Sequence, residues 1–283
     1  MKYVLTSVAF VLSTTAPAFA HHEAIFGPQS SAVLSPSAFL SAQIFDKEKG
    51  RNDDKHREAT TVYSFGFTPV KKKPLSIALV LPMTFTSGTA EPSSHGFEDA
   101  LVTARYQIDA EPFAASIGFD EGYVMAVGGV EVPTGTLDHD FGRSAFGQIA
   151  AGLFSLEKRP IAYLAYVYYH HRNEYNGLRD SGNVFAGGGV AYTPVDTENK
   201  LFSLQLGISN EHTFAAEQNG VPLADSGGSG VFLHPGLVFQ FTSSVQFFAV
   251  ASLPVSQQWS SADDHQRFRL GTGVIWLLKR SGT

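Results

Sequence analysis

Residues 201–209 read Leu-Phe-Ser-Leu-Gln-Leu-Gly-Ile-Ser, so that large apolar residues alternate with small or polar ones. Side chains of a β-strand point alternately to its two faces, and this stretch therefore presents one apolar row and one polar row. Such a strand suits the wall of a transmembrane β-barrel, whose outer face contacts lipid and whose inner face contacts the lumen. Related alternation recurs along much of the chain.

About a dozen segments of strand length follow one another between Ser37 and Leu278. They are expected at residues 37–45, 57–68, 74–86, 98–108, 121–133, 144–156, 160–172, 183–193, 200–210, 230–242, 245–254 and 266–278. The sequence predicts an all-β fold, an antiparallel transmembrane β-barrel of about 12 strands over residues 37–278. No shift in composition divides this range, so it is treated as one domain.

The connections between these segments alternate in length. Those at 69–73, 109–120, 157–159, 194–199 and 243–244 are mostly short, whereas those at 46–56, 87–97, 134–143, 173–182, 211–229 and 255–265 are longer and rich in Gly, Asp, Ser and His. Short periplasmic turns and long extracellular loops produce this rhythm. The connection at 109–120 is the exception, and Glu111-Pro112 is expected to open a small plug or a helix there.

The first twenty residues have the features of a cleavable signal peptide. Lys2 supplies a positive charge, residues 4–12 are apolar, and Ala18-Phe19-Ala20 forms a cleavage site of small residues. An uncleaved anchor is the competing interpretation, but the apolar stretch is shorter than the roughly 20 residues of a spanning helix. We expect a signal peptide at 1–20, a periplasmic segment at 21–36 and a tail at 279–283.

Composition narrows the class of protein further. The chain contains no cysteine, so an exported protein of this kind must be held by backbone pairing and packing, which a closed barrel supplies. No later segment has an apolar run long enough for a spanning helix. The formal charge of −6 argues against a nucleic-acid partner. The competing fold is a soluble secreted β-sandwich, which would lack aromatic belts facing lipid.

Polar rows that alternate with apolar rows identify candidate pore-lining residues. A charge facing lipid at the bilayer midplane costs about 2–4 kcal/mol for Arg or Lys, so such side chains are expected inside the barrel or near a rim. The predicted pore-lining residues are Arg105, Glu131, Gln205, Gln240, Gln246, Arg267 and Arg269. The residues expected in the aromatic girdles are Tyr63, Tyr106, Tyr163, Tyr166, Tyr168, Tyr169, Tyr192 and Trp276.

Catalytic and metal-binding patterns are sparse. His21-His22-Glu23 could chelate copper or zinc, but an ordinary polar terminus is favoured because further ligands are lacking. His170 and His171 point to opposite faces of a strand, and Asp138-His139-Asp140, His56 and His95 are interpreted as solvated loop residues. The chain has no Gly-x-Ser-x-Gly, His-Glu-x-x-His or phosphate-binding glycine motif. We therefore expect no metal, no cofactor and no enzymatic activity.

Several short motifs occur in a characteristic order. They are Gly96-Phe97-Glu98-Asp99, Ala104-Arg105-Tyr106, Gly128-Gly129, Pro133-Thr134-Gly135, Leu233-His234-Pro235-Gly236-Leu237, Leu253-Pro254 and Arg267-Phe268-Arg269-Leu270-Gly271. With these motifs most of the chain after residue 20 resembles a family of outer-membrane proteins assigned to transport in the meta-cleavage pathway of phenol degradation. The resemblance implies a barrel that passes small, aromatic solutes. The chain departs from the usual barrel ending in a terminal aromatic residue, because residues 277–283 follow Trp276.

The sequence predicts a passive channel or transporter for small solutes in the outer membrane of a Gram-negative bacterium. Charged residues of the predicted lumen would set its field, and the glutamines would offer uncharged hydrogen bonds. Two alternatives are a closed barrel with a metal-handling or surface-binding role through loop histidines, and a lipid-modifying enzyme with a Ser–His contact on its outer face. The expected partners are outer-membrane lipid, a small-molecule solute and the outer-membrane assembly machinery.

Overall fold

The computed structural model describes residues 38–50, 56–67, 75–88, 93–136, 145–196, 200–242, 244–261 and 264–278. The predicted signal peptide, the periplasmic segment at 21–36 and the tail at 279–283 lie outside these residues. No helix among the described residues is both long and apolar enough to cross a bilayer.

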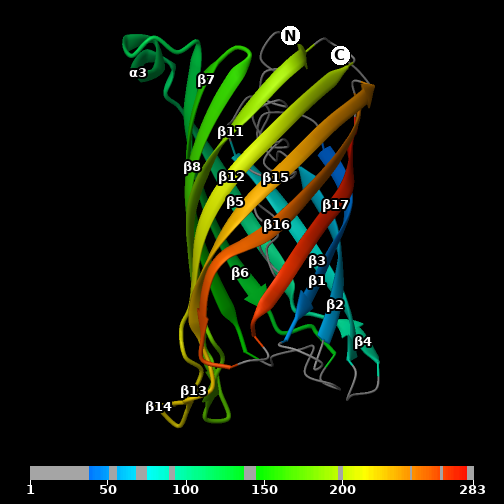
Figure 1. The fold of residues 1–283 in the computed structure, drawn as a ribbon, viewed down its shortest axis with the longest axis vertical. Helices are drawn as coiled ribbons and strands as arrows, with labels where there is room; N and C mark the ends of the chain where they lie inside the picture. The colour runs from blue at the N-terminus through cyan, green and yellow to red at the C-terminus, as the bar shows by residue number, and fades with distance from the viewer. Residues whose placement is uncertain are drawn as a thin grey trace.

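Twelve long strands form a closed antiparallel barrel, as the alternation predicts (Figure 1). They are β1 (Ala38–Lys49), β2 (His56–Phe67), β3 (Leu75–Gly88), β5 (Ala100–Asp109), β6 (Glu121–Val132), β7 (Gly147–Lys158), β8 (Ile161–Arg172), β11 (Asn183–Asp196), β12 (Leu201–Thr213), β15 (Gly228–Thr242), β16 (Val245–Trp259) and β17 (Gln266–Leu278). Pairing of β1 with β17, from Ala38 opposite Leu278 to Lys49 opposite Gln266, closes the ring. A short strand, β4 (Ser94–Phe97), pairs with β3 alone.

Several strands extend beyond their predicted ends toward the longer connections. Strand β12 continues to Thr213 and β16 to Trp259, so that Glu211 pairs with Phe185 of β11 and Gly230 of β15. Backbone pairing does not require apolar side chains. Polar residues therefore continue the hydrogen-bonded strand pairing beyond the apolar rows, toward the long connections. These polar extensions place charged groups near the long-loop end of the lumen.

Two of the long connections contain β-hairpins that together form a second, four-stranded sheet. Its strands are β9 (Glu174–Tyr175), β10 (Leu178–Arg179), β13 (Glu217–Gln218) and β14 (Val221–Pro222), in the order β14-β13-β10-β9. Each hairpin turns at an Asn-Gly pair with positive φ, at residues 176–177 and 219–220. Such pairs favour the tight turns that match strand twist. An ion pair between Arg179 and Glu217 joins the two hairpins.

The connection from β5 to β6 contains the helix α3 (Glu111–Ser116), which confirms the helix expected after Glu111-Pro112. Proline in the first turn and an acidic residue there both favour a helix start. The helix is not a plug, because it projects outward from the barrel wall at the end that carries the short turns (Figure 1). The connection between β5 and β6 is long because it contains this helix on the outside of the barrel.

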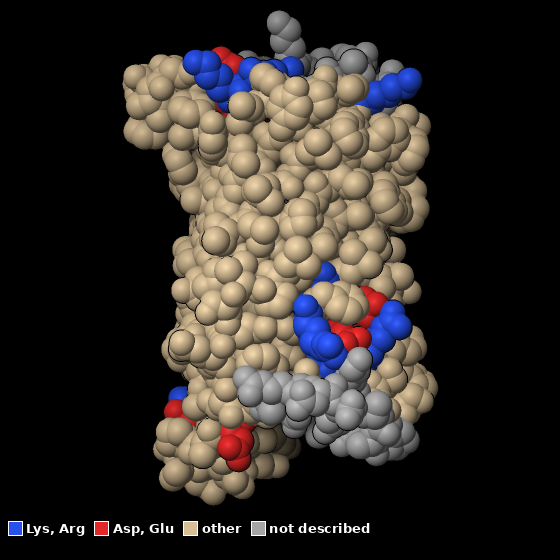
Figure 2. Space-filling model, viewed as in Figure 1, with Lys and Arg blue, Asp and Glu red and all other residues tan. Residues whose placement is uncertain are grey.

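Residues alternate between the barrel interior and its outer face as predicted. On β12, Ser203 and Gln205 are buried, whereas Leu204 and Leu206 are exposed. Figure 2 shows a broad band of this face without charged side chains, as a lipid-facing surface requires. Exposed aromatic residues include Tyr63, Tyr106, Tyr163, Tyr169, Tyr192 and Trp276.

Two residues assigned to the aromatic girdles lie inside the barrel instead. Tyr168 is only 1% exposed, and Tyr166 packs against the same interior cluster. Both share the row of His170 on β8, because side chains two residues apart point to one face. The girdle prediction was wrong for Tyr166 and Tyr168, since it considered residue type without the alternation.

Candidate functional site: the barrel interior

The barrel interior has two walls of different chemistry. The wall formed by β2, β3, β5, β6, β7, β8 and β11 carries one contiguous apolar cluster, whose largest members include Leu101, Met125, Tyr168 and Phe185. Buried polar residues such as Arg105, Glu131 and His170 lie on this wall as well. The wall formed by β12, β15, β16, β17 and β1 has no share in the apolar cluster, although it buries single apolar residues such as Phe232 and Phe248, and it carries a network of polar side chains. Its buried polar residues are Ser41, Lys47, Ser203, Gln205, Ser209, Glu211, His234, Gln240, Gln246, Ser252, Gln266 and Arg269.

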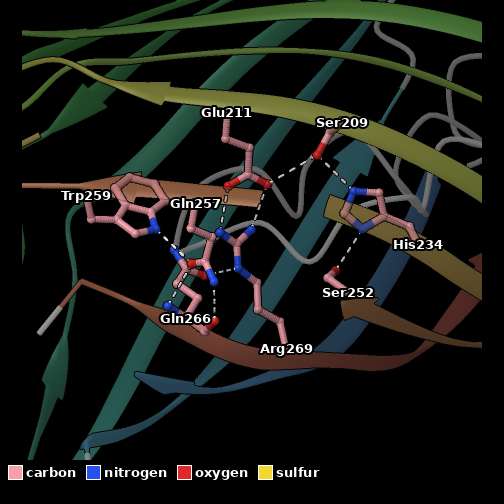
Figure 3. A network of polar contacts seen from close by, with 8 residues as sticks. All are labelled: Ser209, Glu211, His234, Ser252, Gln257, Trp259, Gln266 and Arg269. Atoms are coloured by element: carbon pink, nitrogen blue, oxygen red, sulfur yellow. Dashed lines mark hydrogen bonds and ion pairs between the residues drawn. The ribbon is translucent and has the colours of Figure 1, made fainter. Parts of the chain in front are cut away.

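An ion pair between Arg269 and Glu211 joins the polar network drawn in Figure 3, near the long-loop end of this wall. The guanidinium donates two hydrogen bonds, of 2.7 and 2.6 Å, to the two carboxylate oxygens of Glu211. Both side chains are 3% exposed. The pair joins β17 to β12 across β15 and β16, which lie between these strands in the sheet. It therefore connects strands that share no backbone hydrogen bonds.

Neighbouring residues complete the surroundings of the Arg269 guanidinium. It lies 4.2 Å from the centroid of the Phe232 ring, a cation–π contact, and it donates a hydrogen bond to Gln266. Gln257 and Gln266 exchange two hydrogen bonds, and the indole of Trp259 donates to Gln257 at 2.8 Å. Gln257 and Trp259 are not among the predicted pore-lining residues, because the predicted strand ended at residue 254 whereas β16 continues to Trp259.

His234 forms a second polar group on the same wall. Its Nδ1 lies 2.9 Å from the Ser252 hydroxyl and its Nε2 lies 2.8 Å from the Ser209 hydroxyl. Ser209 is also 3.5 Å from Glu211, which joins this group to the ion pair (Figure 3). A lipid-modifying enzyme was expected to carry a Ser–His contact on the outer face, whereas these contacts are fully buried inside the barrel.

The opposite wall contains a buried acid at the edge of its apolar cluster. Glu131 of β6 lies 2.9 Å from Nε2 of His170 and 3.4 Å from the Arg172 guanidinium, both on β8. Glu131 and His170 are fully buried. His171 instead has Tyr169 as its neighbour, with the tyrosine hydroxyl 3.4 Å from Nδ1. The two adjacent histidines therefore point to opposite faces, as expected.

Two of the family-like motifs contact each other beside β4. The amide of Gly135 donates to the buried Asp99 carboxylate at 2.8 Å, and the amide of Ala100 donates to the Thr134 hydroxyl at 2.9 Å. Glu98, also buried, accepts a hydrogen bond from Thr84. The motifs Gly96-Phe97-Glu98-Asp99 and Pro133-Thr134-Gly135 thus form one joint at the long-loop end of β5 and β6.

The structure separates the predicted pore-lining residues into several places. Arg105, Glu131, Gln205 and Arg269 are buried on inward rows, and Gln240 and Gln246 form a buried pair in which Gln246 donates to Gln240 at 3.1 Å. Arg267 differs from the others. It lies where the β1–β17 register shifts, is 45% exposed and pairs with Glu48 at 3.3 Å. The bulge removes it from the inward row of Arg269.

Metal-binding groups are not assembled in the part of the chain that the structure describes. Those residues contain no group of three or more His, Cys, Asp or Glu side chains arranged to hold a metal ion. His95 stacks on Phe85 with ring centroids 5.9 Å apart. His56 begins β2 and His95 belongs to β4, so the interpretation of both as loop residues was wrong. Residues 138–140 and 21–23, which carry the remaining histidines of this hypothesis, lie outside the described ranges.

Comparisons with known proteins establish the fold. No protein-family model and no curated protein matches the chain. An outer-membrane channel from Pseudomonas putida F1 has a TM-score of 0.67 at 11% identity, covering 86% of this chain and 96% of the channel. The β domain of the Bordetella autotransporter BrkA has a TM-score of 0.52 at 10% identity (86% and 100%), and LpxR from Salmonella typhimurium has 0.50 at 10% identity (85% and 100%). The chain therefore has the fold of outer-membrane β-barrels.

Proposed function

We propose that the protein is a passive outer-membrane channel for small solutes that combine an aromatic or other apolar skeleton with a polar group. The observation that carries this proposal is the contiguous apolar cluster on one side of the interior, opposite the network of hydrogen-bonded polar side chains around Arg269 and His234. An amphipathic solute can lay its ring against the first and exchange hydrogen bonds with the second. A uniformly polar lumen would favour sugars and ions instead.

The size of the barrel supports the same proposal. Eight-stranded barrels are just wide enough for side chains to fill, and barrels of 16–18 strands leave an aqueous channel, so twelve strands lie between these limits. The similarity to the Pseudomonas putida channel agrees with conduction, and the motif resemblance agrees with aromatic solutes. The short-turn end would face the periplasm and the long-loop end the exterior.

Conductance tests this function directly. The folded protein is inserted into a planar bilayer, and simple aromatic acids and neutral sugars of similar size are added in turn. We expect discrete conductance steps that aromatic acids block more strongly than sugars. A silent bilayer at every voltage, with protein shown to be inserted, would contradict the channel.

The variant R269A tests which groups set the field in the lumen. Removing this positive charge leaves Glu211 in place, so we expect conductance to persist and ion selectivity to shift toward cations. The reversal potential in a salt gradient measures the shift. A matched control is R267A, because Arg267 is 45% exposed at the rim and its removal should shift the reversal potential less. Loss of conductance in R269A would count against a passive pore.

A further inference from the structure

The helix α3 and the residues that follow it present an apolar surface on the outside of the barrel. Phe113 is 51% exposed and Ile117 is 47% exposed, although both are large and apolar. Fully burying such a side chain is worth about 1.5–3 kcal/mol relative to leaving it in water. A surface of this kind at the end of a membrane barrel therefore calls for an apolar environment to cover it.

Contacts with the barrel show which way this surface faces. The Phe113 ring lies 6.1 Å from the ring of Phe154, and the Phe119 ring lies 5.8 Å from that of Tyr163 in an edge-on arrangement. Phe154 and Tyr163 belong to the outward rows of β7 and β8. Phe113 of α3 and Phe119 beyond it thus continue the outer belt of the barrel, on a helix that lies at the short-turn end (Figure 1).

The helix is held firmly enough to keep this orientation. Ala114 is fully buried, and a Cβ atom at Gly122 would lie only 2.8 Å from its Cβ, so the glycine permits close packing of α3 on β6. The Ala110 amide donates to the Gly122 carbonyl at 2.9 Å, and the Asp120 amide donates to the Glu157 carbonyl at 2.8 Å. These bonds tie both ends of the connection to the barrel.

We propose that α3 and its C-cap residue form an interfacial anchor, in which Phe113 of the helix and Ile117 directly after it insert among the phospholipids of the periplasmic leaflet. The helix itself carries one charged residue, Glu111, in its first turn, so the contact is with the glycerol and upper acyl region rather than with anionic headgroups. Aromatic residues are enriched at this depth of membrane proteins. Continuity with the lipid-facing rows of β7 and β8 identifies lipid as the occupant.

Spin labelling tests the anchor, because the chain has no cysteine and accepts a single labelled one. The full chain is reconstituted in phosphatidylcholine vesicles with a nitroxide at I117C, and its accessibility to oxygen and to a water-soluble nickel complex is measured. We expect oxygen to dominate at residue 117. The matched control is A115C, which lies about 200° around α3 from Phe113 and should be relaxed mainly by nickel.

A third label at L206C provides the lipid reference, since Leu206 is an exposed outward residue in the middle of β12. Relaxation at 117 by nickel, with oxygen still dominant at 206, would overturn the anchor and leave the barrel in its membrane. Oxygen dominance at 115 as well as 117 would also overturn it, because the whole helix would then be immersed. The result at 117 should not change when anionic lipid is added.

Discussion

At the scale of single residues, burial decides what a charge does in this barrel. Arg269 and Glu211 are 3% exposed and lie inside, whereas Arg57 is 65% exposed and binds Asp46 on the outside. Both arginines make two hydrogen bonds to their carboxylate. The two ion pairs therefore have the same hydrogen-bond geometry but differ in their exposure to solvent. Figure 2 shows charged side chains toward both ends of the barrel, on either side of the uncharged band.

The buried ion pair Arg269–Glu211 and the exposed ion pair Arg57–Asp46 support a prediction about stability. The substitution E211Q leaves Arg269 buried without its carboxylate, and we expect the free energy of unfolding to fall by about 3–5 kcal/mol. The matched change D46N removes an exposed pair and should cost no more than about 1 kcal/mol. Urea titration of the protein in vesicles measures both values. Equal losses would show that the interior pair is hydrated.

At the scale of elements, the connections are more ordered than their composition indicates. The turn at Pro133-Thr134-Gly135 is held by Asp99, and α3 is held against β6 by the absence of a side chain at Gly122. Asp99 and Gly122 therefore each fix the position of a whole connection relative to the barrel. Substitutions at Asp99 and Gly122 test these two contacts and leave the lipid-facing apolar residues of the strands unchanged.

The Asp99 contact predicts local rather than global destabilisation. In D99N the side-chain oxygen can still accept from the Gly135 amide, while in D99A that amide loses its acceptor. We expect hydrogen exchange of the segment 133–136 to accelerate by about tenfold in D99A, corresponding to a lost bond of roughly 1.4 kcal/mol, and to change much less in D99N. Mass spectrometry of exchanged peptides reads this out. Unchanged exchange in D99A would remove Asp99 from the joint.

Packing of α3 gives a second prediction for an element. The substitution G122A places a methyl group 2.8 Å from the Cβ of Ala114, so we expect a loss of about 1–3 kcal/mol from overpacking. The double variant A114G/G122A removes the clash and should recover part of that loss, despite the helix penalty of glycine. Thermal unfolding in a fixed detergent compares the three proteins. A double variant no better than G122A would mean that Leu156 and the Ser155 carbonyl, each 3.2 Å from the added methyl group, limit the space instead of Ala114.

At the scale of the whole molecule, the closed ring imposes opposite requirements on adjacent residues. Gln205 and Leu206 are sequence neighbours on β12, yet one faces the interior and the other the lipid. We expect L206K to lower the free energy of unfolding in vesicles by about 2–4 kcal/mol, which is the cost of a charge near the bilayer midplane. Q205K should cost less, because the polar wall can solvate it. A smaller loss for L206K than for Q205K would reverse the assigned faces.

The sequence by itself determined the class of fold, the faces of several strands and the inward placement of Arg105, Glu131 and Arg269, because alternation with a period of two is a local property of each strand. It also contained signals that were not used, such as the Asn-Gly turns at 176–177 and 219–220. Only the tertiary structure decided which charges meet. Glu211 pairs with Arg269 from a strand fifty-eight residues away, and a bulge turns Arg267 out of its row. Such pairings depend on barrel closure and register, which no single strand encodes.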